Sequence, residues 1–176
     1  MSVRHRIFRK TSLGLTAVSV LGALSLAVAP TQAEELFPLP STGNLFVANQ
    51  TANTIHEFSP TGVDLGTFAS TGLNGPTGLA FDQAGNLYVS NINGNTIREF
   101  SPSGADLGNF ATTGLNNPAG LAFDPKGNLY VSNRGDGTIR EFSRSGTDLG
   151  YFATTGMTTP VGLSFSPEPE DENGDD

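Results

Sequence analysis

The sequence predicts an all-β fold built from repeated antiparallel sheets, and three observations support this prediction. A 42-residue unit occurs three times without a gap, at residues 43–84, 85–126 and 127–168, and the copies are identical at 22 of 42 positions. Each copy holds four short β-type runs separated by turn-forming residues, and several runs are apolar on both faces. A period of about 40 residues made of short strands is typical of β-propeller blades. We therefore expect three four-stranded blades, forming an open arc or half of a six-bladed ring.

The second copy shows the expected strands most plainly. They are Leu87 to Asn91, Thr96 to Ser101, Asp106 to Thr112 and Ala119 to Phe123. The segments between them are rich in Gly, Asn, Pro and Ser, which favour turns. The runs Leu87-Tyr88-Val89 and Leu121-Ala122-Phe123 do not alternate between apolar and polar residues, so both faces of each sheet are expected to be covered by other sheets.

The first 33 residues differ from the repeats and resemble a secretory signal peptide. Four basic residues lie near the start, an apolar stretch covers residues 13–29, and Ala33 supplies a small residue before a cleavage point. The stretch falls short of the ~20 apolar residues of a spanning helix, although an uncleaved membrane anchor is the alternative. We expect a secreted or periplasmic protein with a short linker at 34–42, repeats at 43–167 and a disordered acidic tail at 168–176.

The charge of the chain restricts its partners. The full sequence carries 9 basic and 17 acidic residues, a formal net charge of −8. Without residues 1–33, five basic and seventeen acidic residues remain, a net charge of −12. Such an acidic chain is not expected to bind nucleic acid or, once the signal peptide is removed, a membrane surface. The sequence contains no cysteine, so no disulfide contributes to stability.

The repeats, from about Gly43 to Pro167, resemble a known family. The pattern P-x-G-L-A-F-D-x-x-G-N-L-Y-V-S-N of Pro76 to Asn91, followed by T-I-R-E-F at Thr96 to Phe100, is similar to the NHL repeat. Related six-bladed propellers include TolB-like proteins, gluconolactonases of the SMP-30 type and streptogramin lyases. The resemblance implies that G-L-A-F forms the innermost strand of a blade, followed by L-Y-V-S-N and T-I-R-E-F. The repeats then begin at a second strand, Leu45 to Asn49, and end on an innermost strand, Val161 to Phe165.

Three blades are too few to close a ring, because propellers have about four to eight. An open arc would expose two apolar blade faces. If each face exposes about 400 Å², about 10 kcal/mol of stabilisation is lost per face at ~25 cal/mol per Å². We therefore expect a homodimer that completes a six-bladed ring, in which each C-terminal strand completes the first blade of the partner. The alternative is a truncated propeller fragment.

Residues that occur in all three copies are expected to be structural, because a catalytic site needs unlike groups at one point. Asp64, Asp106 and Asp148 are expected to accept hydrogen bonds from the backbone of a turn. The side chains of Asn49, Asn91 and Asn133 end the second strand of each copy. They are candidates for ligand binding at one rim, with the closing of a turn as the alternative.

Departures from the repeat supply the remaining candidates. His56 stands where the other copies have arginine, and it lies beside Glu57. A lone histidine offers a possible ligand contact or base, with an exposed strand residue as the alternative. Asp82 and Asp124 follow innermost strands and are candidates for holding Ca²⁺ or Mg²⁺ at a common mouth. The third copy has Ser166 at the equivalent position.

The family resemblance does not carry over a catalytic site. Gluconolactonase-type propellers have an Asn metal ligand directly before the Gly of their innermost strand, where this chain has Thr77, Ala119 and Val161. Amidating lyases of the NHL type use several histidines, whereas His56 is the only histidine after residue 33. The sequence thus favours an exported, non-catalytic module that binds a protein, a glycan or a surface through its loops, without a cofactor. The alternative is a lyase or hydrolase that uses a divalent metal.

Overall fold

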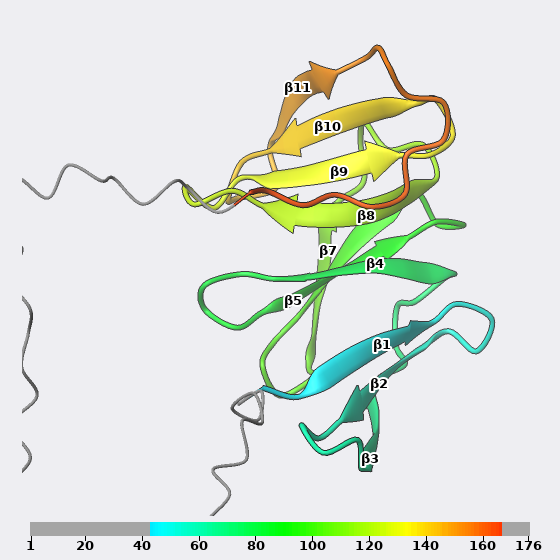
Figure 1. Cartoon of the computed structure of the whole chain (residues 1–176), viewed down its shortest axis with the longest axis vertical. Coiled ribbons are helices and arrows are strands. Elements are labelled where there is room, and N and C mark those ends of the chain that lie inside the picture. The colour runs from blue at the N-terminus through cyan, green and yellow to red at the C-terminus, as the bar shows by residue number, and fades with distance from the viewer. Residues whose placement is uncertain (1–42, 167–176) are drawn as a thin grey trace, which may run out of the picture. The chain divides into compact units, whose positions relative to one another are not determined.

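The computed structural model describes residues 43–166, which form eleven strands and no helix (Figure 1). The strands of the first copy and its continuation are β1 (Leu45–Asn49), β2 (Thr54–Phe58), β3 (Asp64–Ala69) and β4 (Pro76–Phe81). Those that follow are β5 (Leu87–Asn91), β6 (Thr96–Phe100), β7 (Asp106–Ala111) and β8 (Pro118–Phe123). The last three are β9 (Leu129–Asn133), β10 (Thr138–Phe142) and β11 (Asp148–Ala153). The strands predicted for the second copy are confirmed to within one residue at each end.

The strands form three antiparallel sheets that are propeller blades. The first blade has the order β1-β2-β3, the second β4-β5-β6-β7 and the third β8-β9-β10-β11. Each strand pairs with the next one along the chain, so every blade is a meander. The predicted fold class is confirmed. Among residues 43–166 the first blade has three strands, and these correspond to the second, third and fourth strands of the complete blades, as the sequence indicated.

The G-L-A-F strands β4 and β8 lie side by side and join the second blade to the third. Thr77 Oγ1 donates to the carbonyl oxygen of Pro118 at 3.3 Å, and Ser90 Oγ donates to that of Ala119 at 2.6 Å. A Cβ atom at Gly78 would overlap the Ala119 carbonyl oxygen, so the close approach of the two strands requires glycine there. Figure 1 shows β4 and β8 as neighbours. The innermost position that the resemblance implied for these strands agrees with these contacts.

The expected twelfth strand, Val161 to Phe165, is not formed. These residues have no strand assignment, and no second strand of a further blade occurs among residues 43–166 to pair with them. The segment nevertheless lies against the third blade as β8 lies against the second. Ser132 Oγ donates to the Val161 carbonyl oxygen at 3.3 Å, and the rings of Tyr130 and Phe165 have centroids 5.0 Å apart. The segment occupies the place of an inner strand but lacks its hydrogen-bonded neighbour.

Two hydrophobic clusters fill the spaces between the blades. The cluster between the first and second blades contains Ile55, Ala69, Leu87, Val89 and Phe100. The cluster between the second and third contains Tyr88, Ile97, Ala111, Leu121, Leu129, Val131 and Phe142. All five residues of β5 are buried, which confirms that a strand in the middle of the stack is covered on both faces.

The predicted signal peptide at 1–33, the linker at 34–42 and the acidic tail at 168–176 lie outside the described residues. Within residues 43–166 there is no helix with the length and apolar character needed to cross a membrane.

Candidate functional site

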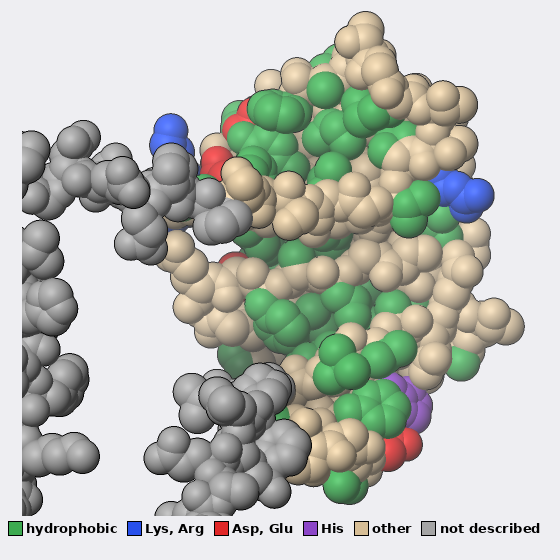
Figure 2. All heavy atoms as spheres, viewed as in Figure 1, with side chains coloured by type: hydrophobic (Ala, Val, Ile, Leu, Met, Phe, Trp, Pro, Cys, Tyr) green, Lys and Arg blue, Asp and Glu red, His purple; other side chains and the backbone are tan. Residues whose placement is uncertain are grey.

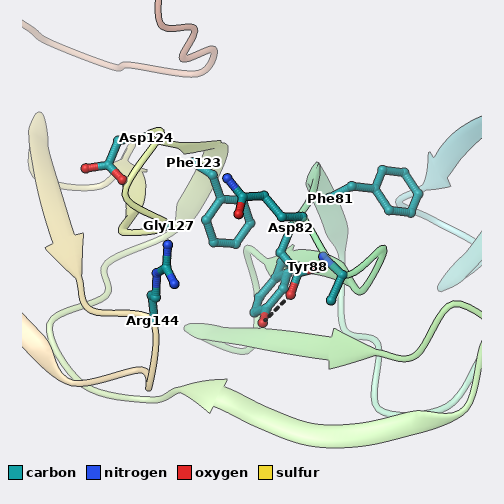
Figure 3. A pocket seen from close by; sticks show the side chains of 9 residues that line it. Phe81, Asp82, Tyr88, Phe123, Asp124, Gly127 and Arg144 are labelled. Atoms are coloured by element: carbon teal, nitrogen blue, oxygen red, sulfur yellow. Dashed lines mark hydrogen bonds between the residues drawn. The ribbon is translucent and has the colours of Figure 1, made fainter.

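A pocket of about 400 Å³ lies beside the turns that follow β4 and β8 (Figure 3). Both metal candidates, Asp82 and Asp124, line it. Its other lining residues are Phe81, Gln83, Ala84, Tyr88, Phe123, Gly127 and Arg144. The inner strands of two blades end at the same mouth, so their turns bring these side chains together. The structure therefore brings Asp82 and Asp124 to one pocket, and their role as metal ligands stays a prediction.

Asp82 is fully engaged with its own turn. Its Oδ1 atom accepts hydrogen bonds from the backbone N–H groups of Ala84 and Asn86, both at 2.8 Å. Its Oδ2 atom accepts from Asn86 Nδ2 at 3.0 Å and faces the Tyr88 hydroxyl at 3.4 Å (Figure 3). A carboxylate with these four contacts fixes the conformation of a turn. Its oxygens are already satisfied before any ligand arrives.

Asp124 occupies the same position one copy later and has fewer partners. Its Oδ1 atom accepts from the backbone N–H of Asn128 at 2.8 Å. Among the described residues, no group of three or more His, Cys, Asp or Glu side chains gathers as a metal site requires. Among residues 43–166, Asp82 and Asp124 are thus the only acidic side chains that line this pocket.

Two tyrosines donate hydrogen bonds to glutamates of neighbouring strands: Tyr88, which lines the pocket and is buried, and Tyr130, which is partly buried. The Tyr88 hydroxyl donates to Glu99 Oε1 at 3.0 Å, and the Tyr130 hydroxyl donates to Glu141 Oε1 at the same distance. Burial raises the pKa of Tyr88 well above its usual value, and the hydrogen bond to Glu99 raises it further. Burial, followed by the bond to Glu141, raises the pKa of Tyr130 to about 12. Both phenols are therefore neutral hydrogen-bond donors at ordinary pH.

Arg144 is a charged residue of the pocket that the sequence analysis did not name as a candidate. Its guanidinium Nε donates to the carbonyl oxygen of Lys126, and the side chain reaches toward Gly127 and the pocket (Figure 3). Pro60 and Pro102 stand at the equivalent positions of the other copies. This departure from the repeat was the available signal, because it puts a cation into one turn where the others have none.

Asn91 and Asn133 hold loops in place. The Oδ1 atom of Asn91 accepts from the backbone N–H of Asn74, and its Nδ2 donates to the Gly72 carbonyl oxygen, both at 3.0 Å. Asn133 repeats this with Asn116 at 3.0 Å and Gly114 at 2.9 Å, and both amides are buried. Asn49 differs: its Nδ2 is 3.4 Å from Thr54 Oγ1. The two buried amides thus tie each second strand to the loop that precedes its blade.

A second, smaller pocket of about 290 Å³ lies beside the loops at the other end of the inner strands. It is lined by Gln50, Ile92, Asn93, Asn117, Arg134 and Gly135. Gln50, Ile92 and Arg134 occupy the same repeat position in the three copies, directly after the asparagine that ends each second strand. Unlike residues at this one position therefore converge on a single opening, which the repeat comparison alone could have indicated.

His56 lies away from both described pockets. His56 belongs to β2, and its ring nitrogens are 3.4 Å from Thr67 Oγ1 and 3.6 Å from Asp64 Oδ1, both of the neighbouring strand β3. The neighbouring Glu57 accepts a hydrogen bond from Asn44 Nδ2 at 2.6 Å. The structure thus does not bring His56 and Glu57 together with Asp82 and Asp124.

The arginines at the equivalent position form ion pairs in the other two copies. Arg98 forms an ion pair with Asp106, and Arg140 Nη2 lies 2.7 Å from Asp148 Oδ2. The same aspartates accept the backbone N–H of Gly108 and Gly150, as expected for turn residues. The hydrogen bond from arginine lowers the pKa of each carboxyl below its usual value.

The comparisons with known proteins agree with this geometry. Residues 115–142 match the family model of the NHL repeat. Residues 43–166 are built of β-propeller blades, and the match to the NHL repeat lies within them. No curated protein sequence matches it.

Several solved structures have a similar fold. A chain of a nidogen/laminin complex is 26% identical with a TM-score of 0.64, and the match covers 72% of this chain and 49% of that one. A streptogramin B lyase is 20% identical with a TM-score of 0.59, covering 69% and 41%. A gluconolactonase from Xanthomonas campestris is 30% identical with a TM-score of 0.52, covering 64% and 37%. The chain therefore spans less than half the length of these proteins.

Proposed function

We propose that this chain is an exported, non-catalytic propeller-type module that binds a partner through the loops at its inner strands. The observation that carries the proposal is the pocket of about 400 Å³ formed by Phe81, Tyr88, Phe123 and Arg144 around two aspartates. Aromatic residues and arginine are enriched at the centres of protein interfaces. A protein partner is favoured over a glycan or a surface ligand because of this composition.

The side chains of the pocket suit a protein guest. Phe81 is 44% exposed at the pocket edge and offers an apolar contact. Arg144 is exposed and holds one backbone carbonyl through Nε, so its terminal nitrogens are placed to donate to a guest carbonyl or carboxylate. The likeness to a chain of a nidogen/laminin complex supports a binding role.

A peptide selection tests the proposal. Peptides would be selected from a displayed library on the immobilised chain and then measured against the Arg144→Pro variant. This substitution installs the residue that the two other copies carry at the same turn, so the fold is expected to tolerate it. We expect selected peptides to bind the variant at least tenfold more weakly. Equal binding to both proteins, or glycan-array ligands that are lost in the variant while no peptide is selected, would contradict a protein guest in this pocket.

A second candidate function is a lyase or hydrolase that uses a divalent metal. It is favoured by the similarity to a streptogramin B lyase and a gluconolactonase, and by the shared location of Asp82 and Asp124. Thermal unfolding with Ca²⁺, Mg²⁺ or Zn²⁺ separates the two. A stabilisation that disappears in Asp124→Asn supports the enzyme, because a bound ion stabilises the folded state. The binding module predicts the same unfolding temperature with and without each ion.

A further inference from the structure

The outer face of the first blade exposes residues that are buried in the other copies. Leu45 is 63% exposed and Val47 is 36% exposed. The residues at the same repeat positions are Leu87 and Leu129, and Val89 and Val131, and all four have an exposed fraction of 0%. Leu87 and Val89 are buried because a preceding blade covers them. The face around Leu45 and Val47 has the composition of a surface that joins blades, without a described blade against it.

The outer face of the third blade shows the matching property. Phe152 is 60% exposed, whereas Phe68 and Phe110 at the same position are partly buried. The backbone carbonyls of Phe68 and Phe110 lie directly against Gly104 and Gly146 of the next blade. Gly62, the equivalent of these glycines in the first blade, has no atom within 4 Å of an added Cβ. Figure 2 shows hydrophobic side chains gathered over the β9–β11 sheet.

The C-terminal segment, Val161 to Phe165, and β1 correspond to the inner strand and the second strand that pair with each other in the complete blades. In the second and third blades the inner strand pairs with the second strand in the same register: Leu79 lies opposite Val89, and Leu121 opposite Val131. Leu163 is the equivalent of Leu121 one copy further along the chain, and Val47 is the equivalent of Val89 one copy back. Leu163 belongs to a segment that is placed as an inner strand, and Val47 belongs to a second strand whose only described strand partner is β2.

We propose that two copies of this chain join into one closed ring, in which segment Val161 to Phe165 of each copy pairs with β1 of the other. The register of the complete blades then places Leu163 opposite the partner's Val47, and Phe165 opposite the partner's Leu45. The pairing supplies the hydrogen-bonded neighbour that each of these two segments lacks among the described residues. It also covers the exposed face of the first blade with the third blade of the partner.

A second copy fits better than another occupant for three reasons. Both incomplete edges carry the same repeat, so the contacts between complete blades can be reproduced between chains without new chemistry. Two sets of three blades make six, which lies within the range of about four to eight that closes, whereas three sets do not. A twofold axis makes the two junctions identical, as in most homodimers.

Cysteine cross-linking tests this pairing on the full chain, which has no cysteine of its own. Val47→Cys and Leu163→Cys would be made as separate variants, mixed under reducing conditions and then oxidised. Opposite residues of an antiparallel pair have Cα atoms about 4.5–5.5 Å apart, within the range that a disulfide bridges. We expect a disulfide-linked pair of chains in the mixture that disappears on reduction, and single chains when either variant is oxidised alone.

A matched control replaces Val47→Cys by Leu107→Cys, which is 54% exposed on an outer strand. The mixture of Leu107→Cys with Leu163→Cys is expected to stay unlinked. Linkage in this control at the same yield shows random collision and overturns the proposal. An unlinked Val47 and Leu163 mixture also overturns it, because the ring places these two residues opposite each other.

Discussion

The ring of Tyr88 stands edge-on to the ring of Phe123, with centroids 4.9 Å apart, and this contact joins the second blade to the third. The same relationship links Phe46 with Phe81 and Tyr130 with Phe165, at 5.0 Å in both cases. Edge-to-face pairs add about 0.5–1.5 kcal/mol beyond the burial of their surface. One aromatic pair per copy therefore fixes how each inner strand sits on the preceding blade.

Replacing Phe123 by Ala should destabilise the chain. Truncating a fully buried Phe costs about 3–5 kcal/mol, and Phe123 is partly buried, so we expect a loss of about 2 kcal/mol in the free energy of unfolding. Urea unfolding measures it. Leu107→Ala, at an exposed outer-strand position, is the control and should change the free energy by less than about 0.5 kcal/mol. Equal losses in the two variants would show that the aromatic contact adds nothing.

The tyrosine hydroxyls should make the fold sensitive to alkali. The folded pKa of Tyr130 is about 12 and that of Tyr88 is also raised, so both phenols stabilise the fold fully below their ordinary pKa of 10.0. This stabilisation is lost as pH rises through the folded values. Between pH 9 and pH 11.5, the free energy of unfolding measured with urea should fall in wild type and should fall less in the Tyr88→Phe, Tyr130→Phe double variant.

The first copy supports this variant as a conservative one, because it has Phe46 at the equivalent position. There Asn44 Nδ2 contacts Glu57 in place of a tyrosine hydroxyl. If the free energy of unfolding declined equally in wild type and variant at alkaline pH, groups other than these tyrosines would be responsible.

The ion pairs between β6 and β7 and between β10 and β11 should make the fold sensitive to acid. The hydrogen bonds from Arg98 and Arg140 lower the pKa of Asp106 and Asp148 from the usual value of 3.8. A lowered folded pKa stabilises the fold above the unfolded value, and the stabilisation is lost as pH falls below about 4. Between pH 5 and pH 2.5, the free energy of unfolding should decline less steeply in the Asp106→Asn, Asp148→Asn double variant than in wild type. A matching slope in both proteins would rule out these carboxyls as the cause.

Two glycines at equivalent positions should respond differently to substitution. A Cβ at Gly120 would overlap the backbone carbonyl of Val161, so Gly120→Ala should lower the free energy of unfolding at any protein concentration. A Cβ at Gly162 meets nothing within 4 Å in one chain. In the proposed ring it faces the partner's Thr77, so Gly162→Ala should weaken the association of two chains and leave the secondary structure by circular dichroism unchanged. A variant that associates as wild type would argue against that junction.

The sequence predicted the blades well because their determinants are local. The strand from Leu87 to Asn91 lies between turn residues and carries apolar side chains on both faces, so its bounds and its full burial follow from the pattern. The asparagines at strand ends and the aspartates of the third turn follow from turn chemistry in the same way.

The sites were harder to predict because they depend on contacts between copies. Arg144 and Asp124 line one pocket only because turns from different copies pack together. Within one copy, the pairing of Arg98 with Asp106 crosses a register shift between β6 and β7, which the repeat pattern does not show. The segment at Val161 to Phe165 has the sequence of a strand but lacks a neighbour among the described residues. A strand needs a partner, and a sequence pattern does not show whether one is present.

The solution mass of the purified wild-type chain tests the two-chain ring most directly. One full-length chain has a mass of 18.3 kDa, and the mass of the isolated polypeptide would be measured on the same sample after denaturation. Light scattering or native mass spectrometry of the folded protein should give twice the mass of one polypeptide. A folded protein with the mass of a single chain would contradict the ring.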